Sequence, residues 1–441
     1  MRIPTRPPDF SELLKEATDP GRFQEILSST QTQGTSKYLH WDKLRHLQPP
    51  EGLSHREWWL ALKLTRGLQA KLTPLKDPAG TAFPYVLVDP IPERLHDIDL
   101  RAGGSIEMDE PITNPDTKDR YLVRSLIGEA ITSSQLEGAA TTRQVAKEMI
   151  RTGRAPSDRS ERMILNNYLT MQRIGKLRNE PLTTERILEV HRLVTKDALD
   201  NPDGAGRFRQ SHEKIDVGDD YGQVFHNPPP AEQLDERMAA MCDFANGKTP
   251  AHFVHPVIRA IILHFWLAYD HPFVDGNGRT ARALFYWSML HSEYWLCEFI
   301  SISEIILQAP VQYARAFLYT ETDGNDLTYF ILYHLEVIRR AIDQLHEYVQ
   351  RKTKELAALE RELRGLIQFN HRQRDLISHA LRHPHHRYTI EGHRSSHNVV
   401  YQTARTDLLD LADRGLFDAK KVRREWWFTP TPDLEEKLRA P

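Results

Sequence analysis

The chemically capable residues of this sequence are concentrated between Tyr269 and Leu284, in the stretch YDHPFVDGNGRTARAL. His271 is the group there whose ordinary pKa suits proton abstraction near neutral pH. Asp275 offers a hard carboxylate oxygen, which Mg²⁺ uses together with substrate phosphate oxygens. Glycines at positions 276 and 278 let the backbone approach a phosphate closely. These residue types indicate transfer of a phosphate-containing group to a hydroxyl.

Two helices must position this segment. Apolar residues from Ile258 to Tyr269 recur at spacings of three and four, and the same spacing resumes after the glycines, which predicts a buried helix on each side of a turn. The N-terminus of the second helix presents unpaired N–H groups and the positive end of the helix dipole to an anion. Asn277 adds an amide donor. Arg279 and Arg282 lie three residues apart, so both can reach the same oxyanions.

The mechanism inferred from these residues is proton removal from a hydroxyl by His271 and in-line attack on a nucleotide phosphate. Mg²⁺, the loop N–H groups and the arginines would stabilise the developing charge. Taken singly, each residue has an ordinary explanation, such as a helix cap for His271 or Asp275 and a turn for Gly-Asn-Gly. The segment also fits the dinucleotide pattern G-x-G-x-x-A, but a helix and not a strand precedes it, which argues against that fold.

The stretch HPFVDGNGRTAR resembles the signature of the Fic family, HxFx(D/E)GNGRxxR, at every specified position. The resemblance implies an enzyme, a nucleotidyltransferase with a helical domain that moves AMP from ATP to a Ser, Thr or Tyr hydroxyl of a protein and releases pyrophosphate. It implies that His271 is the catalytic base, that Asp275 binds Mg²⁺ and that Arg282 contacts the γ-phosphate. The implied phosphate cradle comprises Gly276, Asn277, Gly278 and Arg279.

A second segment, TSSQLEGAATT, matches the inhibitory pattern of the same family, (S/T)xxxE(G/N), with Ser133, Glu137 and Gly138. Taken alone, a Glu on an amphipathic helix is usually a solvated surface residue. Beside the motif, its carboxylate is expected to form a fork-like ion pair with Arg282 and to occupy the γ-phosphate site, so that ATP binds unproductively. This resembles the subclass whose inhibitory helix lies in the same chain, N-terminal to the core, and it implies low basal activity.

Ile215 and Val217 alternate across a Gly-Asp-Asp-Tyr-Gly turn toward Val224, which predicts a hairpin among helices. The hairpin is similar to the family's flap, which holds the target segment as an added strand. An ordinary surface hairpin is the alternative. Tyr313 resembles a family tyrosine near the adenine, although a tyrosine on a helix is more often a core residue.

The chain of 441 residues exceeds the usual size of one hydrophobic core, and its spacings predict a mainly α protein with the hairpin flap inserted. Prolines break up residues 1–118, which are expected to form an irregular N-terminal extension with a helix at 55–72. The catalytic domain, including the inhibitory helix, is placed at residues 119–355. A connector helix and a C-terminal winged helix-turn-helix domain are predicted at residues 356–441.

The C-terminal domain is predicted from helices near residues 373–381 and 399–414, followed by a short basic hairpin. Such a domain binds DNA or docks a protein, and its modest charge surplus favours neither. Over the whole chain, 58 Lys and Arg face 61 Asp and Glu, giving a net charge of -3, so no general attraction to nucleic acid is expected. The sequence has two cysteines, Cys242 and Cys297, and neither an apolar signal region nor a long apolar run. We therefore expect a cytoplasmic location and no membrane partner.

The leading hypothesis is an autoinhibited protein adenylyltransferase that uses ATP and Mg²⁺ and acts on a protein with a hydroxyl side chain, which could be this chain itself. One alternative is removal of AMP, in which Glu137 positions a water. A second is a DNA-binding regulator with a nucleotide-sensing site, although sensing requires neither His271 nor Asp275. A third is a toxin restrained by Glu137. A homodimer that steadies the inhibitory helix is consistent with the resemblance.

Overall fold

Helices make up most of the backbone. The computed structural model describes residues 2–32, 38–103, 115–218, 222–365, 369–422 and 425–439. Within these ranges the strands form only small sheets of two or three strands, which confirms the prediction of a mainly α protein. The chain divides into two compact units, residues 1–105 with 125–342 and residues 106–124 with 343–441. No helix in the described ranges is long and apolar enough to cross a bilayer.

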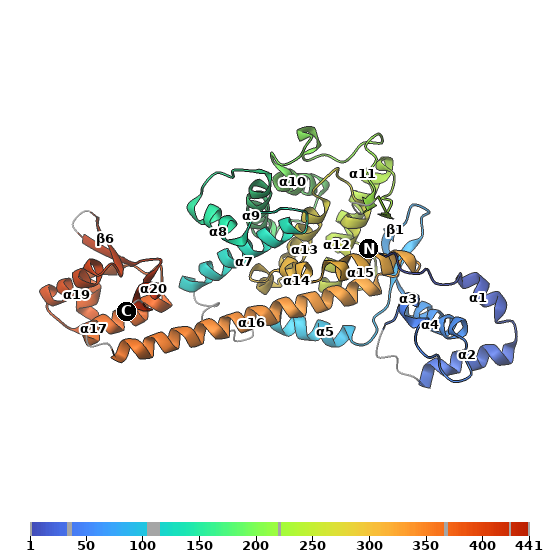
Figure 1. Cartoon of the computed structure of the whole chain (residues 1–441), viewed down its shortest axis with the longest axis horizontal. Coiled ribbons are helices and arrows are strands. Elements are labelled where there is room, and N and C mark those ends of the chain that lie inside the picture. Colours follow the sequence, from blue (N-terminus) through green and yellow to red (C-terminus); the bar gives the residue numbers. More distant parts are fainter. Residues whose placement is uncertain are drawn as a thin grey trace. The chain divides into compact units, whose positions relative to one another are not determined.

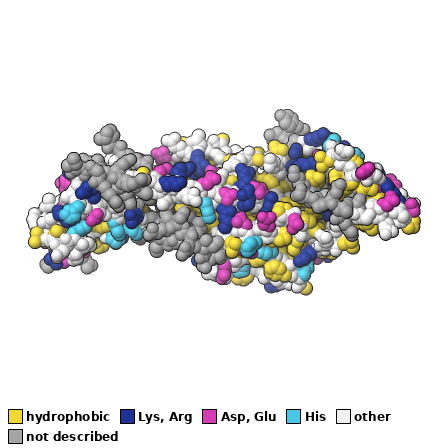
Figure 2. Space-filling view, turned by 90° about the horizontal axis from the view of Figure 1, so that it is seen from below, with side chains coloured by type: hydrophobic (Ala, Val, Ile, Leu, Met, Phe, Trp, Pro, Cys, Tyr) yellow, Lys and Arg dark blue, Asp and Glu magenta, His cyan; other side chains and the backbone are white. Residues whose placement is uncertain are grey.

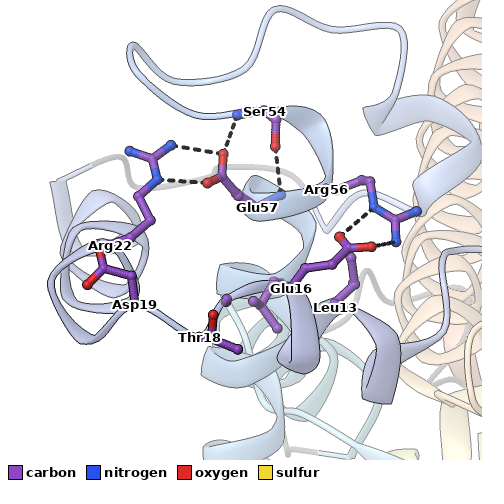
Figure 3. Close-up of a pocket in the computed structure, with 10 residues that line it drawn as sticks. Leu13, Glu16, Thr18, Asp19, Arg22, Ser54, Arg56 and Glu57 are labelled. Carbon is purple, nitrogen blue, oxygen red and sulfur yellow. Dashed lines mark hydrogen bonds and ion pairs between the residues drawn. The ribbon is translucent and has the colours of Figure 1, made fainter.

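The N-terminal segment is more regular than its prolines indicated. It forms α1 (Phe10–Glu16), α2 (Pro20–Thr32), α3 (Trp41–Leu44) and α4 (His55–Gln69). Ser54 and Glu57 form a capping box that starts α4. Arg22 pairs with Glu57 at 2.7 Å and joins α2 to α4. Arg56 pairs with Glu16 at 2.7 Å, and both ion pairs border a hollow of about 320 Å³ (Figure 3). Capping and ion pairing therefore order helices between the prolines.

A hairpin shortens the helix that was predicted at residues 55–72. Helix α4 ends at Gln69, and the next residue, Ala70, is already extended. The chain continues into β1 (Lys71–Lys76), which pairs antiparallel with β2 (Ala82–Tyr85). The helix α5 (Ile91–Ile98) and the π-helix η1 (Asp99–Gly103) follow. The Leu327 N–H donates to the Pro84 carbonyl over 2.9 Å, which ties the hairpin to the helical core of the same unit.

Two consecutive helices, α12 (Pro256–Asp270) and α13 (Asn277–His291), lie at the centre of the first unit (Figure 1). Nearly every residue of both helices is buried, as their apolar spacing predicted. The neighbouring helices are α8 (Arg143–Thr152), α9 (Arg159–Leu177), α10 (Thr184–Thr195), α11 (Leu234–Ala245), α14 (Ile302–Gln308) and α15 (Pro310–Thr322), with the 3-10 turn η4 (Trp295–Glu298). The last part of α7 (Pro115–Gln135), from Ser125 onward, belongs to the same unit.

The predicted hairpin lies between α10 and α11. Strand β3 (Val217–Gly218) pairs antiparallel with β4 (Val224–His226), so that Val217 lies opposite His226. Ile215 precedes the first strand. The turn residues 219–221 lie outside the described residues. The hairpin is thus shorter than predicted and begins two positions later.

The second unit contains the C-terminal module. It comprises α17 (His371–Arg382), β5 (Tyr388–Thr389), α18 (Ile390–His397), α19 (Tyr401–Asp413), β6 (Phe417–Val422), β7 (Glu425–Pro430) and α20 (Leu434–Arg439), and the sheet order is β5-β7-β6. Helices α17 and α19 agree with the two predicted helices. The sequence analysis missed β5 and α18, because the segment is short and polar. The long helix α16 (Thr328–Gly365), which was predicted as a connector, precedes the module.

The surface carries both signs of charge. On the face shown in Figure 2, Lys and Arg side chains are interspersed with Asp and Glu side chains. This mixture agrees with the net charge of -3 of the whole sequence. The charges that matter for chemistry are therefore the local ones of the candidate site.

Candidate active site

The loop between α12 and α13 has an unusual backbone at both ends. His271 caps α12 in the left-handed region, with φ 45° and ψ 56°, and its N–H donates to the Leu267 carbonyl over 3.0 Å. Gly276 caps α13 with φ 82°, and a Cβ at that position would lie 2.6 Å from Thr195 Cγ2. Only glycine satisfies both demands at position 276. The loop therefore packs directly on α10 and exposes the N-terminus of α13.

Asn277 shapes the loop with its side chain. Its carbonyl oxygen accepts from the Phe273 N–H over 2.9 Å, and its amide donates to the Phe273 carbonyl over 2.8 Å. The amide that was predicted as a phosphate donor is therefore engaged within the loop. The backbone N–H groups of Asn277 and Gly278, in the first turn of α13, have no partner inside the helix and remain the donors for an anion.

His191 on α10 supports the loop from beneath, and the sequence analysis missed it. Its ring stacks on Phe273 with centroids 3.6 Å apart and an angle of 2° between the planes. Its Nε2 lies 2.9 Å from the Asp275 carbonyl oxygen, and its Nδ1 lies 3.0 Å from the Gly206 nitrogen. These partners require a neutral ring that donates from Nε2 and accepts at Nδ1. Burial lowers the pKa of His191 to about 4, which agrees with that neutral form.

His271 has the tautomer that a general base needs. Its Nδ1 lies 3.3 Å from the Ala268 carbonyl oxygen, which places the proton on Nδ1 and leaves Nε2 as the acceptor. Burial lowers the pKa of His271 to about 4, so the ring is neutral at pH 7. The Arg209 guanidinium donates from Nε to the His271 carbonyl over 2.9 Å. Arg209 comes from the segment before the hairpin, and it fixes the backbone of His271.

Asp275 lies at the edge of the loop, with 39% of its side chain exposed. Its Oδ1 accepts from Arg279 Nη2 over 3.1 Å, and its Oδ2 lies 3.4 Å from Arg159 Nη2. Among the described residues no group of three or more metal-binding side chains occurs. A metal at Asp275 would therefore take most of its ligands from phosphate and water, which suits Mg²⁺.

Arg279 occupies a different place from the one the sequence indicated. It is 1% exposed, and its Nη1 donates to the Val194 carbonyl over 3.4 Å beneath the loop. It is not among the residues that line the cavities at the loop. In this structure Arg279 holds the carboxylate of Asp275 in place, whereas Arg282 reaches the cavity.

Arg282 makes contact with the predicted inhibitory segment. Its Nη2 donates to Glu137 Oε1 over 2.8 Å and to the Ser133 carbonyl over 2.9 Å, and its Nε donates to Ser133 Oγ over 2.8 Å. The predicted fork toward Glu137 is thus shared with Ser133. A Cβ on Gly278 would lie 2.2 Å from Glu137 Oε1, so the glycine provides the space for this carboxylate. Gly138, directly after it, turns the chain with φ 89°.

A buried carboxylate anchors the helix that precedes Glu137. Glu129 on α7 is 2% exposed and accepts from the hydroxyls of Tyr286 at 2.9 Å, Ser301 at 2.7 Å and Ser303 at 2.5 Å. The Ser303 N–H adds a fourth bond at 3.1 Å. Glu129 therefore fixes α7 to α13 and to the start of α14, and it sets the position from which Glu137 reaches Arg282.

Two cavities, of about 230 Å³ and 390 Å³, meet at the loop. Glu137, His271, Asn277 and Gly278 line both of them. Of the predicted flap residues, Val217 lines the smaller cavity and Ile215 the larger one. Tyr313 also lines the smaller cavity, and its hydroxyl lies 2.9 Å from His264 Nε2. His271, the helix N-terminus, Arg282 and the hairpin therefore surround one continuous site.

The segment that contains this site is similar to proteins of a known family. The model of the Fic/DOC family matches residues 181–289, which include α10, the hairpin, α12 and the loop. The chain is similar to "Protein adenylyltransferase Fic" of Nematostella vectensis, with 31% identity over 201 residues, 45% of this chain and 43% of that protein. It is 29% identical to the protein of the same name from Aedes aegypti over 180 residues, 40% of this chain and 34% of that protein. The chain thus matches less than half the length of these relatives.

Among solved structures, the chain resembles a Fic family protein from Desulfovibrio desulfuricans. The TM-score is 0.50 with 18% sequence identity, and the match covers 77% of this chain and 94% of that chain. At this identity the likeness concerns the fold. It extends well beyond the residues that the family model matches.

Proposed function

We propose that the chain is an autoinhibited protein adenylyltransferase, because the model of the Fic/DOC family matches residues 181–289. It would move AMP from ATP to a Ser, Thr or Tyr hydroxyl of a protein. The observation that carries the proposal is the arrangement of His271, the N-terminus of α13 and Arg282 around one cavity. The names of the similar proteins from Nematostella vectensis and Aedes aegypti support the same activity.

In this mechanism Nε2 of His271 accepts the proton of the target hydroxyl. The hydroxyl oxygen then forms a bond to the α-phosphorus of ATP, the bond from that phosphorus to the bridging oxygen breaks, and pyrophosphate leaves. The neutral ring of His271, with its proton fixed on Nδ1, supports this role. The hairpin β3-β4 would hold the target segment as an added strand beside the base.

The phosphates would lie against the first turn of α13. The N–H groups of Asn277 and Gly278 point out of the helix N-terminus there, and Arg282 offers its guanidinium from the next turn. Asp275 would hold Mg²⁺, which neutralises phosphate charge and orients the leaving group when bound. Arg279 keeps the Asp275 carboxylate turned toward that position.

Autoinhibition is the second part of the proposal. Glu137 Oε1 accepts a hydrogen bond from Arg282 Nη2 over 2.8 Å. Arg282 is the residue that would bind the γ-phosphate, and Glu137 already holds its guanidinium. ATP bound beside an occupied Arg282 would present its α-phosphate in the wrong direction for attack. Low basal activity and strong activation on removal of the Glu137 carboxylate follow from this arrangement.

Removal of AMP from a modified protein is the alternative that the site favours next. Glu137 and His271 line the same cavities, so the carboxylate could position a water at the phosphorus.

The C-terminal module follows the helix, strand, helix, helix and hairpin order of a winged helix-turn-helix, which supports the prediction of such a domain. A DNA-binding regulator and a restrained toxin are further candidates. A homodimer is retained as a proposed assembly.

The test is transfer of label from ATP that carries a radioactive α-phosphate. Wild type, Glu137→Gly, and Glu137→Gly combined with His271→Ala are compared on the chain itself and on a cell lysate. We expect label on protein with Glu137→Gly, little with wild type and none with the double variant. Absence of label in all three samples would contradict the proposal. Release of AMP from a pre-labelled protein by wild type would favour the alternative.

A further inference from the structure

The candidate site contains a carboxylate that the mechanism above does not use. Glu321, near the C-terminus of α15, lines the smaller cavity together with His226 from the hairpin. We propose that Glu321, oriented by His226, reads the nucleobase and selects a 6-amino purine over a 6-oxo purine. The inference rests on the proposed function, because it assigns the substrate's base to the same cavity.

The position of Glu321 matches the distance between a phosphate and a base. Tyr313, Phe317 and Glu321 are spaced by four residues and share one face of α15, so two helical turns, about 12 Å, separate the first from the last. Tyr313 lines the same cavity as Arg282, at the phosphate end, and its hydroxyl lies 2.9 Å from His264 Nε2. Glu321 therefore lies at the opposite end of the cavity from the phosphate loop.

The walls at this end suit a flat aromatic ring. The remaining side chains that line it are mainly apolar and come from α15 and from the hairpin: Ala314, Phe317, Leu318 and Phe225. In such a lining, the polar groups decide which ring is accepted. The polar side chains here are Glu321, the His226 that it contacts and Tyr269, whose ring packs on His226.

His226 determines which oxygen of Glu321 is occupied. Its Nδ1 lies 2.7 Å from Glu321 Oε2, and its Nε2 lies 2.6 Å from the Tyr269 carbonyl oxygen. Both partners are acceptors, so both ring nitrogens carry protons and the ring is an imidazolium. Burial opposes this charge, but the hydrogen bond to Glu321, the charge of Glu321 and the Tyr269 carbonyl together outweigh it, and the pKa of His226 lies above its ordinary value. His226 thus holds Oε2 and fixes the plane of the carboxylate.

The site consequently presents an acceptor to the base. In the part of the chain that the structure describes, no hydrogen bond reaches Glu321 Oε1. The amino group at position 6 of adenine donates to such an oxygen. With the ring in the same position, the oxygen at position 6 of hypoxanthine or guanine would face it with lone pairs, and both acceptors would remain unpaired. The N1–H donor of these rings would reach Oε1 only if the ring moved along the cavity. ATP should therefore bind better than ITP, which differs from it at this edge of the ring.

Direct binding tests the inference independently of transfer. Isothermal titration calorimetry compares ATP and ITP on the Glu137→Gly, His271→Ala double variant. In this variant no Glu137 carboxylate competes with the nucleotide for Arg282, and ATP is not consumed. We expect ATP to bind roughly tenfold or more tightly than ITP. Equal binding of the two would overturn the proposal. Because no label is measured, a failure of the proposed transfer reaction would leave this result unaffected.

A substitution of one atom should change the preference. In Glu321→Gln, His226 would hold the amide oxygen, so the amide NH₂ would face the base as a donor. The ATP-to-ITP affinity ratio should fall to about one or below. The matched control is Glu336→Gln on α16, which removes a carboxylate outside the cavity and should keep the original ratio. An unchanged ratio in Glu321→Gln, or an equal loss of both nucleotides, would overturn the proposal.

A nucleotide series provides a measurement that needs no change at Glu321. Purine riboside triphosphate lacks a substituent at position 6, and N6,N6-dimethyl-ATP keeps the nitrogen but has no N–H there. Both should bind more weakly than ATP to the same double variant, because neither can donate to Glu321. If purine riboside triphosphate binds as tightly as ATP, the carboxylate does not read the base.

Discussion

Arg282 donates from Nη2 to Glu137 Oε1 over 2.8 Å, and the carboxylate lies in space that only the absence of a side chain on Gly278 provides. The residue that would bind the outer phosphate is thus already occupied. The ion pair also has a second partner, because Ser133 accepts from the same guanidinium. This arrangement leads to separate predictions for each part of the contact.

Ser133→Ala should weaken the inhibited state without abolishing it. The variant removes the hydroxyl that accepts from Arg282 Nε but keeps the Ser133 carbonyl and Glu137. Loss of one such bond should raise basal labelling about two- to tenfold, which remains below the level of Glu137→Gly. Ser134→Ala is the matched control, since the Ser134 hydroxyl is buried and has no partner among the described residues. Equal effects of the two substitutions would argue against a role for Ser133.

Glu129→Ala should both destabilise the protein and raise its basal activity. The substitution leaves the donors of Tyr286, Ser301 and Ser303 without their common acceptor and loosens α7. The melting temperature should fall by several degrees, as for the loss of a buried hydrogen-bond network.

The comparison for Glu129 is Glu304→Ala. Glu304 pairs with Arg143 at 3.0 Å on the surface, where an ion pair contributes little to stability. Differential scanning fluorimetry and the label-transfer assay are run on both variants. A stable, fully inhibited Glu129→Ala protein would show that α7 is held by other contacts.

The pH dependence of transfer should reflect the environment of His271. Burial lowers the pKa of this ring to about 4, whereas an ordinary histidine titrates near 6.5. In Glu137→Gly, kcat/KM should therefore stay nearly constant as the pH falls from about 7.5 to about 5.5, because the base remains neutral. A fall to half the maximum near pH 6.5 would show an unperturbed histidine and contradict the buried geometry.

Stability should decrease as the solution becomes more acidic. Burial lowers the pKa of His191 to about 4 and that of His334 to about 3, below the value of 6.5 in an unfolded chain. Between these values the unfolded chain binds more protons than the folded one, so falling pH favours unfolding. The melting temperature should fall steadily from about pH 6.5 to pH 4. His334→Leu should reduce this slope, and an unchanged slope would exclude His334 as a source.

Metal removal should act through Asp275. In Glu137→Gly, chelation with EDTA should abolish label transfer, and added Mg²⁺ should restore it. Asp275→Asn keeps the shape of the side chain but removes its charge, and it should lower transfer at least about a hundredfold. Arg159→Ala is a control for the surface partner of Asp275 at 3.4 Å and should have a small effect. Full transfer in EDTA would remove the metal from the mechanism.

The sequence was informative where function depends on residues that are close along the chain. The turn between α12 and α13 and the hairpin could be anticipated from local motifs. The pairing of Glu137 with Arg282, which are 145 residues apart, was expected only from the family resemblance. His191 and Arg209 could not, because their roles arise only when α10 and the segment before the hairpin pack against the loop. Arg279 shows the same limit, since its spacing from Arg282 did not reveal that it turns beneath the loop. His226 and Glu321 are 95 residues apart and meet only in the folded chain.

The stacking of His191 on Phe273, together with the Asn277 clamp, has a thermodynamic consequence. A loop that is already ordered loses little conformational entropy when a nucleotide binds, so ordering the loop subtracts little from the free energy of nucleotide binding. Weakening the stack should lower affinity through an unfavourable entropy of binding, while the enthalpy of the phosphate contacts stays nearly the same. The loop is thus already rigid before a nucleotide binds.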